Sequence, residues 1–112
     1  MDDETGDLSL DVSLRGSAAT LSVRGELDVS TAPELADLCR SVHALGARDV
    51  VIDLTDTSFL DSSGLRALIG ARQLFSDGGG NVRLAHPTAP VLRLLDLSGL
   101  TAYFSVDETP TD

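Results

Sequence analysis

Residues 49–71 read DVVIDLTDTSFLDSSGLRALIGA, a strand pattern followed by a short polar loop and a helix pattern. The continuous apolar run over residues 50–52 predicts a strand buried on both faces, as in a parallel sheet. Asp61 or Ser62 is suited to begin the helix, because either side chain can cap free backbone amides. Leu65, Leu68 and Ile69 would then share the buried face of that helix. A buried strand leading into such a helix favours an α/β domain.

The rest of the chain extends this alternation in both directions. Apolar residues at every second position predict a hairpin over residues 8–24, and shorter strands at 81–85 and 103–106. Helical spacing predicts one helix capped by Ser30 or Thr31 and stopped near Gly46, and another from about Thr88. The predicted order is β-β-α-β-α-β-α-β. Strands separated by helices favour parallel pairing, and the hairpin adds an antiparallel pair, so we expect a mixed sheet with helices packed on it.

Composition narrows the possible functions. The chain has 112 residues, 42% of them hydrophobic, which suits a single globular domain. Its formal net charge of −10 argues against binding to nucleic acid or to an anionic membrane surface. No apolar run approaches a membrane span, and no basic-then-apolar leader opens the chain. Cys39 is the single cysteine, which excludes an internal disulfide and a cysteine metal cluster. We therefore expect a cytoplasmic protein.

Seven of the 18 acidic residues lie near the two ends of the chain. We expect an acidic N-terminal tail over residues 1–7, a folded domain over 8–106, and an acidic C-terminal tail over 107–112.

The start of the predicted helix at residues 61–63 (Asp-Ser-Ser) allows two interpretations. Asp61 or Ser62 could simply cap the helix, since the first amides of a helix lack internal partners. Alternatively, a serine displayed at this point could be phosphorylated, because the positive end of a helix tolerates an anion. Physical chemistry alone leaves both interpretations open.

Three stretches together resemble the STAS domain family, in its anti-sigma factor antagonist type. VRGELD at residues 23–28, followed by TA at 31–32 and EL at 34–35, looks like the start of such a domain. SFLDSSGL at 58–65 is similar to the family's phosphorylation segment, and LDLSGL at 95–100 resembles a later signature. The matches keep their order and spacing over most of residues 8–106. The resemblance implies a STAS-type mixed sheet.

The resemblance also implies a partner-switching role in bacterial transcription. The dephosphorylated antagonist binds an anti-sigma factor that is also a serine kinase, and this frees the sigma factor. The kinase uses ATP to phosphorylate the antagonist, which is then released, and a serine phosphatase restores it. Carried onto this chain, the phosphoacceptor is Ser62. The expected partner-binding residues are Glu26, Asp28, Asp61, Ser63, Gly64, Leu65 and Arg66. We expect such a domain to need no cofactor of its own and to be a monomer when free.

Two features depart from the family. Pro110 discourages the helix that usually follows the last strand, so we expect that strand to be less protected. Arg66 stands where many relatives carry a small residue, and could select a different kinase.

Two other functions are compatible with a serine at a helix start. A hydrolase triad built from Ser62, an aspartate, and His43 or His86 lacks the G-x-S-x-G elbow, so we do not expect an enzyme. A STAS domain of a transport or ligand-sensing complex, which binds a partner or nucleotide without being phosphorylated, is the alternative.

Overall fold

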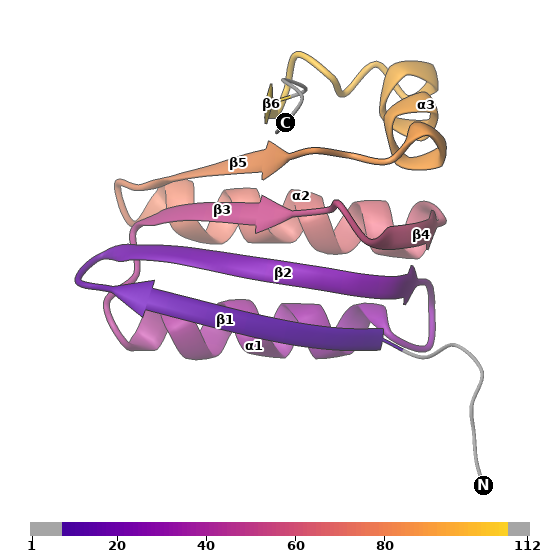
Figure 1. Ribbon diagram of the computed structural model, residues 1–112. Coiled ribbons are helices and arrows are strands. Elements are labelled where there is room, and N and C mark those ends of the chain that lie inside the picture. Colours follow the sequence, from indigo (N-terminus) through magenta and orange to yellow (C-terminus); the bar gives the residue numbers. More distant parts are fainter. Residues whose placement is uncertain (1–7, 108–112) are drawn as a thin grey trace, which may run out of the picture.

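The computed structural model describes residues 8–107, which form one mixed α/β sheet domain (Figure 1). The elements, in chain order, are β1 (Leu8–Arg15), β2 (Ala18–Leu27), α1 (Ala32–Ala44), β3 (Asp49–Asp53), β4 (Thr57–Leu60), α2 (Ser62–Asp77), β5 (Asn81–Ala85), α3 (Ala89–Leu97) and β6 (Ser105–Asp107). The expected tail over residues 1–7 lies outside the described residues. So does the expected C-terminal tail, except for Asp107, which ends β6.

The sheet runs β1-β2-β3-β5-β6, and the predicted fold class is confirmed. β1 and β2 form the expected antiparallel hairpin, while β2–β3, β3–β5 and β5–β6 are parallel. The predicted element order holds, with the addition of β4, which pairs in parallel with the end of β2. The sequence pattern predicts a polar loop for this stretch, and that prediction is wrong. Thr57 explains the difference, because its hydroxyl is buried and donates a 2.8 Å hydrogen bond to the Val23 carbonyl.

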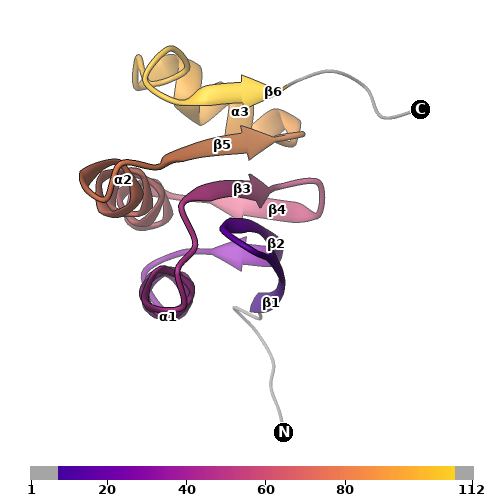
Figure 2. The ribbon, with the colours of Figure 1, turned by 90° about the vertical axis from the view of Figure 1, so that its left-hand side faces the viewer.

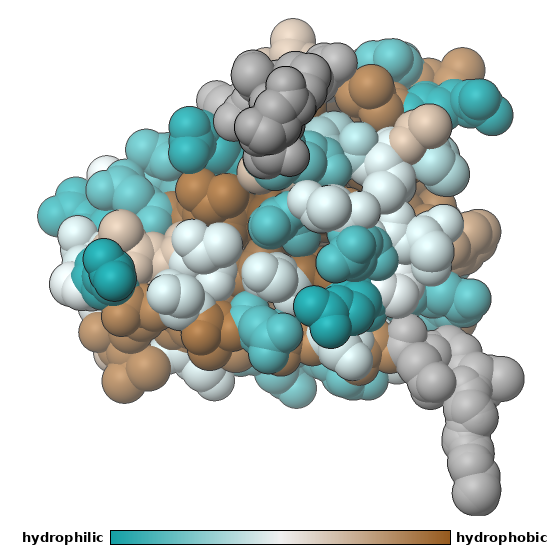
Figure 3. All heavy atoms as spheres, in the orientation of Figure 1, coloured by the Kyte–Doolittle hydropathy of each residue, from teal (hydrophilic) through white to brown (hydrophobic). Residues whose placement is uncertain are grey.

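Helices α1 and α2 lie on one face of the sheet (Figure 2), whereas α3 lies past the end of β5 and contacts β4 (Figure 1). From β2 onward, the strands of the main sheet are added in one direction, and right-handed crossovers then place α1 and α2 on the same side. The prediction that β3 is buried on both faces is therefore wrong. Val50 and Ile52 face the helices and are buried, whereas Val51 is only half-buried on the open face. Figure 3 looks onto that open face, where polar and weakly hydrophobic residues predominate.

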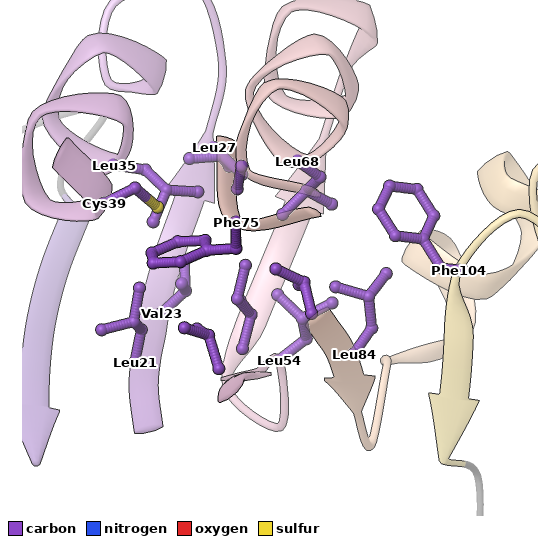
Figure 4. Packing of buried hydrophobic residues seen from close by; sticks show 14 of the residues in the cluster. Leu21, Val23, Leu27, Leu35, Cys39, Leu54, Leu68, Phe75, Leu84 and Phe104 are labelled. Atoms are coloured by element: carbon purple, nitrogen blue, oxygen red, sulfur yellow. The ribbon is translucent and has the colours of Figure 1, made fainter. Parts of the chain in front are cut away.

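The core fills the space between the sheet and the helices (Figure 4). Phe75 of α2 is fully buried near the middle of this layer, and the His43 ring meets it edge-on with centroids 5.4 Å apart. Phe104, just before β6, closes the core at the α3 side. The helices and the single apolar face of the sheet therefore share one continuous core, which fixes α2 against β2, β4 and β5.

Candidate functional site at the start of α2

Ser62 is the first residue of α2, and its side chain is exposed. The preceding Asp61 is the N-cap, and its carboxylate accepts hydrogen bonds from the amides of Ser63 (2.8 Å) and Gly64 (3.1 Å). Capping by Asp61 is thus confirmed. Among the hydrogen bonds within residues 8–107, none involves the Ser62 hydroxyl. A hydroxyl in this position is open to an approaching enzyme.

The loop between β2 and α1 is held by the Asp28 carboxylate. Its Oδ1 accepts hydrogen bonds from the amides of Ser30 (2.9 Å) and Thr31 (3.1 Å). Thr31 occupies the N-cap position of α1 as expected, but its side chain makes no capping bond. Its buried hydroxyl instead donates to the Glu26 carbonyl at 2.7 Å and accepts from the Asp28 amide at 2.9 Å. Asp28 is therefore a loop-fixing residue as well as a candidate contact.

Pairing of β4 with β2 brings the Asp28 loop beside the start of α2 (Figure 1). Leu27 lies opposite Leu60 in this pairing, and the Asp61 amide donates to the Leu27 carbonyl at 3.3 Å. Gly64 completes the contact. A β-carbon added there would lie 2.5 Å from the same carbonyl oxygen, so only glycine lets α2 approach β2 this closely. The two segments thus form one surface at the carboxyl end of β2.

The structure divides the candidate residues by exposure. Glu26, Ser62 and Arg66 are exposed, while Asp28, Asp61 and Ser63 are half-buried. Gly64 and Leu65 are buried and contribute to the packing of α2 on the sheet, so they do not present side chains to a partner.

Two apolar residues at this end of the molecule were not predicted from the sequence. Phe59 lies in β4 opposite Glu26 and is 47% exposed, and Val29 follows Asp28 in the loop and is 71% exposed. Phe59 lies inside the segment that resembles the phosphorylation site, but alternation alone gave no sign that it faces solvent. Exposed large apolar side chains beside a displayed serine are typical of a surface that binds another protein.

A groove of about 380 Å³ runs between α1 and α2 beside this surface. Arg66, Gly70 and Gln73 line it from α2, and Ala36 and Arg40 line it from α1.

Other kinds of site find no support in the described part of the chain. Within residues 8–107, no group of three His, Cys, Asp or Glu side chains is arranged to hold a metal ion. In the same range, no helix is long and apolar enough to cross a membrane.

Comparison with known protein families identifies the family of this domain. The model of the STAS domain matches residues 9–112. The chain belongs to the STAS domain family. Its relatives include an "Anti-sigma-B factor antagonist" of Staphylococcus epidermidis, which is 32% identical over 88 residues, 79% of this chain and 82% of the relative.

Solved structures agree on the STAS fold. An anti-sigma factor antagonist from Mycobacterium paratuberculosis superposes with a TM-score of 0.83 at 27% identity, over 95% of this chain and 90% of that one. The Bacillus cell fate determinant SpoIIAA, solved in its phosphorylated form, superposes with a TM-score of 0.71 at 17% identity, over 88% and 90% of the two chains. At that identity, the likeness to SpoIIAA concerns the fold alone.

Proposed function

We propose that this STAS domain is a cytoplasmic anti-sigma factor antagonist that is switched by phosphorylation of Ser62. The main support for the proposal is that Ser62 is exposed at the start of α2 while Asp61, not Ser62, caps the helix. The names of its relatives support the same role. In the dephosphorylated state the domain binds an anti-sigma factor that is also a serine kinase, and the sigma factor is released.

The transfer step needs only a reachable hydroxyl on this chain. The Ser62 Oγ attacks the γ-phosphorus of ATP held by the kinase, and the bond from that phosphorus to the β–γ bridging oxygen breaks. ADP leaves, and the hydroxyl proton passes to a base of the kinase. A serine phosphatase reverses the change by hydrolysis. The domain is a substrate in both steps and supplies no catalytic group.

The switch is electrostatic. In the dephosphorylated state, Phe59 and Val29 supply apolar contact area, and Glu26 and Asp28 supply negative charge for a basic partner surface. A phosphate on Ser62 adds about −1.5 to −2 charges, which must be desolvated if the same interface forms. A loss of about 3 kcal/mol would weaken binding more than a hundredfold. The fold need not change for the partner to be released.

The test is intact-mass analysis after incubation with candidate anti-sigma kinases and ATP, followed by fragment mapping. We expect one added phosphoryl group on Ser62, retained in Ser63→Ala and lost in Ser62→Ala. Ser62→Ala should still bind the kinase, whereas Ser62→Asp should bind it at least tenfold more weakly. Phosphoryl transfer to Ser63 instead would support the phosphorylation switch but show that its site is Ser63.

The remaining outcomes discriminate between functions. Tight binding without modification would make the protein a constitutive antagonist. Neither binding nor modification by any candidate kinase would contradict the proposal and favour a transport or ligand-sensing role. Light scattering of the free protein tests the monomer that we propose.

A further inference from the structure

Arg66 lies four residues after Ser62 in α2, so the two side chains share one face of the helix on successive turns. The same stripe continues through Gly70 and Gln73, which line the groove against α1 together with Arg66. Ser62 therefore lies one helical turn before Arg66, the first residue of α2 that lines the groove.

Two arginines line this groove, and within residues 8–107 Arg66 is the one without an ion pair. The ion pairs found within residues 8–107 join Arg24 to Asp56 and Arg40 to Asp37. Arg40, on the opposite wall, is thus paired with Asp37 of its own helix. Arg66 is exposed and forms no such pair in this part of the chain.

A phosphate on Ser62 would need a cation because its other neighbours are unfavourable. The amides of Ser63 and Gly64, which could otherwise bind an anion at the helix start, already donate to Asp61. Asp61 and Asp28 add negative charge nearby, and Glu26 is exposed at the same end of the sheet. The dianion is therefore repelled from the loop side and attracted along α2.

We propose that Arg66 is a positioning residue that binds the phosphoryl group of phosphorylated Ser62 through its guanidinium. The planar fork of an arginine suits two phosphate oxygens at once. The pair would hold the phosphate over the first turn of α2, at the end of the groove, where it blocks the surface that the dephosphorylated form offers. The biological relevance of this pair rests on the proposed function.

The test uses full-length protein with phosphoserine incorporated at position 62 during translation, so no kinase is required. Phosphorus NMR against pH gives the second pKa of the phosphate. In Arg66→Gln we expect this pKa to rise by about half a unit, because an adjacent cation favours the dianion. Arg66→Lys should recover most of the shift, and Arg40→Gln, the matched control across the groove, should leave it unchanged.

Thermal unfolding supplies a second readout. Arg66→Gln should lower the midpoint more in the phosphorylated than in the unmodified protein, because only the former contains the pair. Equal phosphate pKa values in wild type and Arg66→Gln, or an equal shift in Arg40→Gln, would overturn the inference. Failure of every candidate kinase to modify either Ser62 or Ser63 would instead contradict the proposed switch and leave these measurements valid.

Discussion

At the scale of single residues, Asp61 has two roles that a single substitution would remove together. Its carboxylate caps α2, and it also carries negative charge beside the candidate phosphoacceptor. If Asp61→Ala bound a partner less well, the cause could be either a less stable start of α2 or the loss of the negative charge.

Asp61→Ala should lower the free energy of unfolding by about 1 kcal/mol, the usual cost of removing a good N-cap. Asp61→Ser is the matched control, because serine can cap the helix without a charge. We expect it to retain nearly full stability in urea titrations while changing kinase binding. An alanine variant as stable as wild type would show that the cap contributes nothing to the fold.

At the scale of elements, two glycines of α2 play opposite roles. Gly64 touches the Leu27 carbonyl, whereas Gly70, in the groove, has no atom within 4 Å of where a β-carbon would stand. The start of α2 is therefore packed tightly against β2, whereas the groove-facing side of the helix has room for a side chain at Gly70.

Gly70→Ala should stabilise the protein by about 0.5–1 kcal/mol, because alanine is the better helix former. Gly64→Ala should destabilise it by more than 1 kcal/mol despite the same propensity gain, because α2 must move away from β2. Denaturant titrations of both variants measure the contrast. Changes of the same sign would contradict the close approach of α2 to β2.

The elements also show how far the sequence determines the prediction. Apolar periodicity predicted the hairpin, α1, α2 and β5, because those patterns depend on local residues. It failed at Thr57, whose burial depends on a carbonyl 34 positions earlier, and at Val51, whose exposure depends on crossover handedness. The serine and the acidic loop were predicted from motif resemblance. The exposure of Phe59 was not, because strand pairing alone decides it.

At the scale of the whole molecule, the global stability should depend on pH through one buried thiol. Burial raises the pKa of Cys39 to about 11 from an ordinary value of 9.0, with Arg40 opposing the shift in part. The folded protein keeps this proton where the unfolded chain loses it, so stability falls as pH rises from 9 to 11. The chain has no lysine to obscure the effect.

Between pH 9 and pH 10, the wild-type protein should lose about 1 kcal/mol more free energy of unfolding than Cys39→Ala. The variant is expected to be less stable at neutral pH, because it leaves a small cavity, so the comparison concerns slopes. Urea titrations at several pH values give both slopes. Parallel slopes would mean that the thiol ionises as easily in the folded state as in the unfolded one.

The antiparallel direction of β1 has a practical consequence for attaching labels. Leu8 lies opposite Gly25, so anything fused ahead of it joins the fold within a few residues of the Asp28 loop. A purification tag there would crowd the surface formed by the Asp28 loop and the start of α2, and would lower the measured affinities for a partner. The turn at Gly16 and Ser17 lies at the far end of the hairpin. Ser17→Cys would give an accessible handle for a fluorophore or a sensor chip, while Cys39 stays shielded in the core.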